Sequence, residues 1–460
     1  MTAASQTPNA DRTGAFIATA RGRNFPTEVI DAARMCLVDT VGVGIGAHAE
    51  GAGQTVRQVA AKWGTTGNAQ LLLGGKAAPA AAALVNATLG HCLDYDDTHV
   101  GAVAHLSSPT WNTALALGLH HGVDERDILA AYIAGFETAA RLGSGGLGQA
   151  ANERGFHSTG VFGCLGAATT ASVLLGLDEA GIRNALGAAA TQVGGLIGSF
   201  GTMSKPFHAG KAALNGILAA ELAAEGFVAA ENLIEEEGPL ARALIQDGSE
   251  VIRAFDPAGQ WEITQNTFKP YASCLLTHPV IDSARKVSDA VKGREIDGIR
   301  VQVSPFCIQM AGKPGPQTGL EGKFSTAYCA ALGIEGHMAT ANDFAEDRVK
   351  DPSLQNLVSR VELVPDEGRD VRSARIEIHF TDGTSLDSDT PLALGNPDNP
   401  MSWDDMRVKF DGLVVPVLGE QNGAELFECC AGLIAARWKI TFGWSRATRR
   451  GRIIWGHVPY

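Results

Sequence analysis

The chain has 460 residues, of which 45% are hydrophobic and 19% are charged, and its 37 basic and 50 acidic residues give a formal net charge of −13. This composition excludes a largely disordered chain, and the negative charge disfavours nonspecific binding to nucleic acid or to anionic membranes. The first residues are polar, no apolar run is expected to cross a bilayer, and the eight cysteines form no C-x-x-C pair. We therefore expect a soluble cytoplasmic protein without a nucleic-acid or membrane partner.

The chain from about residue 14 to 257 has the pattern of successive apolar helices. Apolar side chains in 128–140 recur at three- and four-residue steps, and 163–177 and 212–227 have the same period with many Ala and Gly residues. Because these segments are apolar on most of their faces, the helices are predicted to be buried against one another. We predict a large all-helical domain whose first part covers residues 1–266.

The pattern changes near residue 260 to the two-residue alternation of half-buried strands. The predicted strands are 298–304, 359–364 and 373–380. Asp382 and Gly383 then supply the residues of a tight hairpin turn before a strand over 385–390. With helical patterns at 278–292 and 323–334, residues 267–398 are predicted to form a smaller α/β lid domain with a largely antiparallel sheet. The predicted fold class is mainly α with a smaller α+β domain.

After a turn-rich run, residues 399–460 are predicted to return to the helical domain through a helix within 402–436. Residues 437–460 differ from the rest, because they contain six basic residues, no acidic residue and three of the seven tryptophans. A basic aromatic tail can bind nucleic acid or a membrane surface. We favour the alternative, an irregular extension packed on the acidic body.

Nucleotide-binding motifs receive no support from their context. The run GSGGLG at 143–148 fits G-x-G-x-x-G, but it follows a helical pattern and not a strand. The chain also contains no P-loop, no H-E-x-x-H and no G-x-S-x-G. The sequence therefore predicts no local cofactor site.

The densest group of polar residues is HCLDYDDTH at 91–99. If 82–98 were helical, Asp94, Asp97 and Thr98 would share one face of the helix. Carboxylates this close must raise their pKa, bind a cation or cap neighbouring helices. Oxygen ligands suit Mg²⁺, and a catalytic or substrate-orienting carboxylate is a further alternative. The sequence leaves these readings open.

Two cationic candidates stand in Gly-rich apolar surroundings. The run GFHSTG at 155–160 places His157 just before a long apolar helix, whose positive N-terminus lowers an imidazole pKa and attracts anions. Lys205 comes directly before Pro206, so an extended or turn conformation is predicted for it. A buried core histidine and a solvated surface lysine are the ordinary alternatives.

Two further polar runs lie in the predicted lid domain. KPYASC at 269–274, followed by His278, stands at the proposed domain junction, where clefts form. GKFSTAY at 322–328 places polar side chains on an apolar helix, and an ordinary amphipathic stripe explains it equally well.

Taken in order, LDYDDTH, GFHSTG, TMSKPFHAGKAALNG, KPYASCLLTH and GKFSTAY resemble the motifs of the MmgE/PrpD family, over about residues 14–436. That family includes 2-methylcitrate dehydratases, cis-aconitate decarboxylases and iminodisuccinate epimerase. The resemblance implies a helical domain with an α/β lid, a homodimer, no required organic cofactor, and an active site between the domains. We assign no metal ligand, and whether the run from Asp94 to Asp97 binds a cation stays open.

The resemblance also implies roles for residues of this chain. Catalytic roles fall to Lys205, His157, Tyr328, His278, Asp94 and His105. Substrate binding is assigned to Thr98, Lys269, Ser273 and His208. Leu106 stands where proline is common in the family, and the segment before His105 differs in length, so His99 is an alternative to His105.

These enzymes act on small di- or tricarboxylates, and their common step adds or removes a proton beside a carboxylate. That step needs a positioned base and cationic donors aimed at the charge that develops on oxygen. We expect an isomerase that epimerises iminodisuccinate. The alternative is a lyase, either a hydro-lyase or a decarboxylase, acting on 2-methylcitrate or cis-aconitate. A non-catalytic ligand-binding protein of the same fold is a third hypothesis.

Overall fold

The computed structural model describes residues 7–64 and 67–433, and within them the chain divides into two compact units. Of the described residues, the first unit takes 7–64, 67–92, 99–264 and 414–433, and the second takes 93–98 and 265–413. The predicted basic tail, 437–460, lies outside the described residues.

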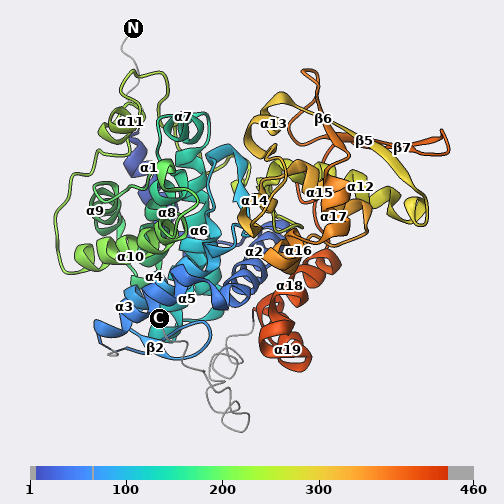
Figure 1. Cartoon of the computed structure of the whole chain (residues 1–460). Coiled ribbons are helices and arrows are strands. Elements are labelled where there is room, and N and C mark those ends of the chain that lie inside the picture. The colour runs from blue at the N-terminus through green and yellow to red at the C-terminus, as the bar shows by residue number, and fades with distance from the viewer. Residues whose placement is uncertain (1–6, 65–66, 434–460) are drawn as a thin grey trace. The chain divides into compact units, whose positions relative to one another are not determined.

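The first unit is helical, as the apolar periodicity predicts. Its centre consists of helices that pack on one another in Figure 1: α4 (Pro79–Cys92), α5 (Ser107–His121), α6 (Glu125–Gly143), α8 (Ser158–Leu175) and α10 (Ser204–Ala224). Small residues allow this close packing. A Cβ on Gly216 of α10, for example, would lie 2.5 Å from the backbone nitrogen of Ala168 in α8. Gly216 therefore serves the close contact between α8 and α10.

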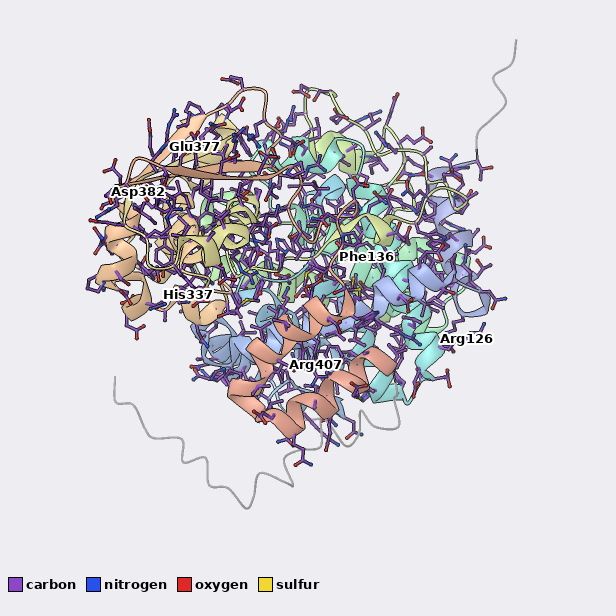
Figure 2. All side chains as sticks on the ribbon, turned by 90° about the vertical axis from the view of Figure 1, so that its right-hand side faces the viewer. Arg126, Phe136, His337, Glu377, Asp382 and Arg407 are labelled. Carbon is purple, nitrogen blue, oxygen red and sulfur yellow. The ribbon has the colours of Figure 1, made fainter. Side chains whose placement is uncertain are left out.

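Aromatic side chains fill the interior of the first unit. The rings of Trp111 and Tyr132 stack with centroids 4.0 Å apart, and Phe136 of α6 is fully buried beside Tyr132 (Figure 2). By length and composition, helix α8 could cross a membrane, although no such segment was predicted from the sequence. In the structure, 94% of Ser158–Leu175 is buried inside the protein. Helix α8 is therefore a core helix of the first unit.

Further α-helices and two short strands of the first unit lie outside this central group. They are α1 (Asn9–Ala18), α2 (Thr27–Gly46), α3 (Gly51–Lys62), β1 (Ala69–Gln70), β2 (Lys76–Ala77), α7 (Leu147–Glu153), α9 (Glu179–Ala190), α11 (Pro239–Leu244) and α19 (Glu420–Gly432).

The second unit contains a four-stranded sheet in the order β6-β5-β7-β8. The strands are β5 (Ile296–Val303), β6 (Val361–Pro365), β7 (Ala374–Phe380) and β8 (Ser385–Thr390). β7 pairs antiparallel with β5 and β8, and β6 joins β5 in parallel. The hairpin turn after β7 has Gly383 at φ +83° and Asp382 at its tip (Figure 2). The predicted, largely antiparallel sheet is confirmed.

Helices cover one face of this sheet, since α12 (His278–Val291) packs on β7 and β8. The other helices of the second unit are α13 (Pro305–Ala311), α14 (Gly319–Lys323), α15 (Thr326–Ile334), α16 (Glu346–Val349) and α17 (Pro352–Val358), and α18 (Trp403–Leu418) extends across the boundary at residue 413. The chain is mainly α with a smaller α+β part, as the sequence predicts.

The observed units differ from the predicted boundaries in two respects. The second unit extends to residue 413, where 398 was predicted, and it includes the separate segment 93–98. Contacts that no local pattern reveals hold this segment, because Lys323 donates to the carbonyl of Leu93 at 3.3 Å and Lys409 donates to that of Tyr95 at 2.7 Å.

The premise of a helix over 82–98 is wrong. Helix α4 ends at Cys92, and Asp94 has a left-handed backbone with φ +54°. That conformation interrupts the right-handed helix, so Asp94, Asp97 and Thr98 do not share a helical face.

The predicted extended conformation of Lys205 is also wrong. Helix α10 begins at Ser204, so Lys205 and Pro206 lie in its first turn. Proline is tolerated there, because the backbone N–H that it lacks has no partner within the helix at this position.

Candidate active site

Four histidines and one lysine of the first unit form a cluster. His91 lies in the last turn of α4, and His105 precedes α5. His157 directly precedes α8, and Lys205 and His208 lie in the first turns of α10. Three segments far apart in the sequence therefore bring basic groups together. Of the predicted residues, this cluster unites His105, His157, Lys205 and His208.

His91 lies at the centre of this cluster, although the assignment of roles omitted it. Its ring centroid is 4.5 Å from that of His105 and 5.6 Å from that of His157, with the second pair stacked. All three side chains are buried. The signal available in the sequence was its place at the start of the polar run 91–99.

Main-chain contacts fix the position of His157. Its backbone N–H donates to the carbonyl of Gly195 at 2.9 Å. His157 occupies the N-cap position of α8, and its side chain makes no hydrogen bond to the helix there. The ring is 3% exposed, and its Nδ1 lies 3.0 Å from Nδ1 of His208. The backbone N–H of His105 donates to the hydroxyl of Thr159 in the first turn of α8, at 3.0 Å. The start of α8 therefore orders two of the candidate imidazoles.

Burial keeps His157 neutral. Desolvation strongly lowers the pKa of His157, and repulsion from His91, Lys205 and His105 lowers it further. The pKa of the half-buried His208 is lowered by desolvation and then by Lys205. At neutral pH these two imidazoles therefore carry no charge, and each offers one N–H donor and one lone pair.

The ammonium of Lys205 supplies the positive charge of the cluster. Its Nζ lies 5.2 Å from the centroid of the Phe200 ring, and that ring meets His157 edge-on with centroids 4.9 Å apart. A cation beside neutral imidazoles forms a place where a polycarboxylate can bind and where developing negative charge is stabilised.

His99 does not replace His105. Its Nδ1 accepts the N–H of Ala102 at 3.1 Å, and its Nε2 lies 3.1 Å from a carboxylate oxygen of Glu262. The ring is buried against Phe136. His99 therefore holds the loop that leads to His105, and His105 is the histidine that joins the cluster.

The second unit groups other predicted residues around Asp94. Lys269 is 4% exposed, and its Nζ donates to the backbone carbonyl of Asp94 at 2.6 Å and approaches a carboxylate oxygen of the same residue at 3.3 Å. A buried ammonium thus compensates the left-handed backbone of Asp94. Thr98, at the end of this segment, is half-buried.

Lys409 belongs to the same group and was not predicted from the sequence. It is 5% exposed, donates to the carbonyl of Tyr95 and lies 4.0 Å from the centroid of the Tyr95 ring. Consecutive carbonyls, those of Leu93, Asp94 and Tyr95, each accept from a different lysine. Lys409 lies on a helix of ordinary amphipathic pattern, so no motif identifies it.

His278 and Ser273 form a compact loop contact. The ring of His278 is fully buried, and its Nε2 donates to the backbone carbonyl of Ser273 at 3.2 Å. The hydroxyl of Ser273 lies 2.8 Å from that of Thr277. Desolvation lowers the pKa of His278 to about 3, and Lys269 contributes repulsion.

Acidification is expected to destabilise the protein through His278. In the unfolded chain His278 binds a proton near pH 6.5, whereas in the folded protein it stays neutral until about pH 3. The free energy of unfolding is therefore unaffected by His278 above pH 6.5 and falls as the pH drops below it. From these values the loss at pH 5 is about 2 kcal/mol. Urea unfolding at pH 7.5 and 5.0 measures the change in the free energy of unfolding between the two pH values. This change should be smaller by about 2 kcal/mol in His278→Gln than in the wild type. An identical pH dependence in the variant would contradict the assignment.

Tyr328 lies in the first turn of α15 and is fully buried. Its hydroxyl donates to the backbone carbonyl of Asp343 at 2.7 Å, and burial raises its pKa above the ordinary phenol value. This geometry gives the phenol a structural partner. Its role as a proton carrier stays a prediction, as does the substrate contact of Ser273.

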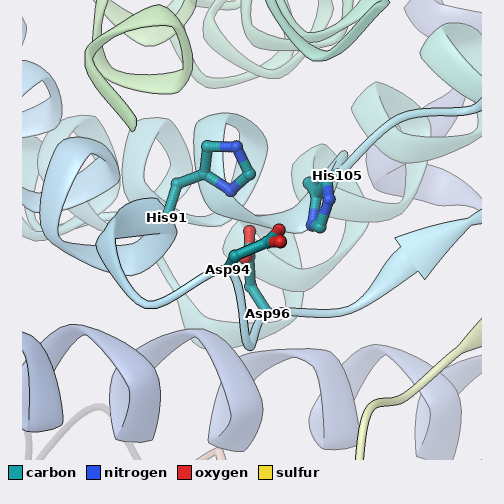
Figure 3. A group of neighbouring side chains, drawn as sticks. All are labelled: His91, Asp94, Asp96 and His105. Atoms are coloured by element: carbon teal, nitrogen blue, oxygen red, sulfur yellow. The ribbon is translucent and has the colours of Figure 1, made fainter. Parts of the chain in front are cut away.

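Figure 3 shows His91, Asp94, Asp96 and His105, each of which offers one ligand atom, and these atoms all lie within 4.8 Å of one another. Imidazole and carboxylate ligands suit several divalent metals. Catalysis without a metal stays our prediction.

Two family models cover most of the chain. The MmgE/PrpD N-terminal domain matches residues 11–250, and the MmgE/PrpD C-terminal domain matches residues 271–432. The chain belongs to the MmgE/PrpD family, as its ordered motifs predict.

Curated relatives of the chain are named cis-aconitate decarboxylases. The Homo sapiens protein is 30% identical over 349 residues, which cover 72% of each chain. The Aspergillus terreus protein is 25% identical over 444 residues, covering 89% of this chain and 90% of the relative. The Mus musculus protein is 27% identical over 352 residues, covering 72% of this chain and 71% of the relative. These names favour the lyase alternative over the predicted epimerase.

Proposed function

We propose that this protein is a lyase that decarboxylates cis-aconitate or a closely similar small polycarboxylate. The observation that carries the proposal is the buried group of imidazoles beside Lys205 in the first unit, in which burial lowers the pKa of His157. The names of the relatives select the substrate class.

The chemistry of this substrate matches that group. When the carboxylate on the CH₂ carbon leaves as CO₂, its bonding pair forms a new double bond to the central carbon. The old π pair moves to the CH carbon and spreads onto the adjacent carboxylate, and one proton must then be delivered to that carbon. The products are CO₂ and methylenesuccinate.

Each component of the cluster has a task in this step. The ammonium of Lys205 stabilises the charge that gathers on the carboxylate oxygens. A neutral imidazole holds a proton that it can deliver to carbon, and His157 is the first candidate because burial keeps it uncharged. In an acidic chain, this local positive charge attracts an anionic substrate.

Further parts of the proposal concern the whole protein. We propose a cytoplasmic homodimer without an organic cofactor. Of the second unit, Thr98 and Lys269 are proposed to bind substrate, and Asp94 and His278 to take part in catalysis. Size-exclusion chromatography with light scattering tests the dimer, and a monomeric mass would remove it.

Proton NMR in D₂O tests the reaction. With cis-aconitate we expect release of CO₂ and a methylenesuccinate that carries one deuterium on its saturated carbon. Iminodisuccinate and 2-methylcitrate are the comparison substrates, because epimerisation or dehydration of these was the other expectation. Deuterium exchange into iminodisuccinate without any decarboxylation of cis-aconitate would overturn the lyase in favour of the epimerase.

A further inference from the structure

The contact between His157 and His208 joins two like nitrogen atoms. Nδ1 of His157 lies 3.0 Å from Nδ1 of His208, within hydrogen-bond distance. A hydrogen bond between two imidazole nitrogens needs a proton on one and a lone pair on the other. Two protons would clash, and two lone pairs would repel. In the neutral pair the contact therefore holds one proton.

The position of this single proton decides whether Nε2, on the other side of the His157 ring, carries a proton. A neutral imidazole carries one N–H, so a proton on Nδ1 leaves Nε2 as a base, and a bare Nδ1 places the proton on Nε2 as a donor. The partner at Nδ1 therefore decides which of these two forms of His157 is present.

The backbone holds the ring of His208 in this contact. A Cβ on Gly195 would lie 2.9 Å from Nδ1 of His208, and Gly195 has φ +127°, a conformation that side chains rarely adopt. The carbonyl of the same glycine accepts the N–H of His157. Gly195 thus bonds His157 and leaves no room for a side chain beside His208, and a Cβ on Gly160 in α8 would also lie 3.4 Å from Cβ of His208.

We propose that His208 is a positioning residue that acts through His157, holding one proton between the two Nδ1 atoms and so fixing the tautomer of His157. The inference rests on the proposed proton transfer and adds a role that differs from the substrate binding first assigned to His208. The charged and titratable groups that face the pair are His91, His105 and Lys205, all of which oppose a second proton on it.

Nitrogen NMR tests the tautomer without any turnover. In protein labelled with ¹⁵N-histidine and without substrate, the wild type is expected to show a single tautomer for His157, assigned by its loss in His157→Gln. In His208→Leu, which fills the space without a polar atom, the His157 signals are expected to shift to a mixture of tautomers. An unchanged single tautomer in His208→Leu would overturn the proposal.

Kinetics supply the second readout, with a matched pair of variants. His208→Leu is expected to lower kcat by about 30-fold with little change in KM, the size of effect typical of residues that orient a functional imidazole. His208→Asn keeps an amide near the former Nδ1 and should stay within about fivefold of the wild type. Equal losses in both variants would overturn positioning by a hydrogen bond and indicate a proton carrier instead.

A distant histidine serves as the control. His121 is exposed at the end of α5, and His121→Leu should leave both kcat and the His157 tautomer unchanged. If the wild type decarboxylates none of the tested acids, the proposed function fails, yet the NMR result still decides the role of His208.

Discussion

Replacing Lys205 with methionine is expected to lower kcat/KM for cis-aconitate by about 10³-fold. The methionine side chain has a similar length but no charge, so the variant removes the ammonium and little volume. Removal of one preorganised donor to a developing oxyanion typically costs 10²–10³-fold, and loss of the charge also weakens attraction of the anionic substrate. Steady-state kinetics of both variant and wild type measure the effect.

A matched lysine gives the control for this experiment. Lys62 is exposed on α3 of the same unit, and Lys62→Met changes the net charge by the same amount. We expect its kcat/KM to stay within about twofold of the wild type, because exposed charges are screened by water and salt. Equal rates in Lys205→Met and Lys62→Met would remove Lys205 from the site.

The same variant has a second, electrostatic consequence. Lys205 lowers the pKa of both His157 and His208 by repulsion, after desolvation. Its removal should therefore raise both pKa values, and protonation of the cluster should begin at a higher pH than in the wild type. Histidine NMR titration is expected to show the higher pKa of His208 in Lys205→Met, and Lys62→Met should not show it.

Much of the fold could be predicted from local patterns. The apolar period of 128–140 falls within α6, and the two-residue alternation of 373–380 matches β7. Both patterns are local, because a helix or a strand buries a face that repeats along its own sequence. The family motifs identified the cluster of the first unit for the same reason: each motif is a short run.

Two kinds of feature could not be predicted in this way. The left-handed backbone at Asp94 has its carbonyl bonded by Lys269, 175 residues away, and the conditional helix over 82–98 could not reveal that contact. His91 and Lys409 acquire their places only through tertiary contacts. Residue type alone does not reveal a partner that is distant in the sequence.

A buried ion pair in the first unit leads to the prediction with the largest effect on stability. Glu137 of α6 is fully buried, and its carboxylate accepts from Arg141 at 2.8 Å and from the N–H groups of Glu262 and Ile263 at 3.1 and 2.9 Å. Arg141 also donates to the carbonyl of Asp256 at 2.7 Å. The pair therefore attaches the segment 256–263 to α6.

This attachment extends to the candidate site. The side chain of Glu262 pairs with His99, whose backbone N–H and carbonyl both pair with Ala104. His105 follows directly. A series of hydrogen bonds and ion pairs thus leads from Glu137 to the residue before His105. None of the bonds described for Glu137 reaches a residue of the cluster itself.

Replacing Glu137 with leucine is expected to destabilise the protein by about 3–5 kcal/mol, because it leaves a buried guanidinium and two backbone N–H groups without their acceptor. A thermal-unfolding midpoint lower by about 3–5 °C should report this loss in a chain of 460 residues. Glu153→Leu at the exposed end of α7 is the control and should stay within about 2 °C. The double variant Glu137→Leu/Arg141→Met should lose less than the sum of the single variants, since it removes both charges. Additive losses would show that Glu137 acts only through its backbone contacts and not through the ion pair.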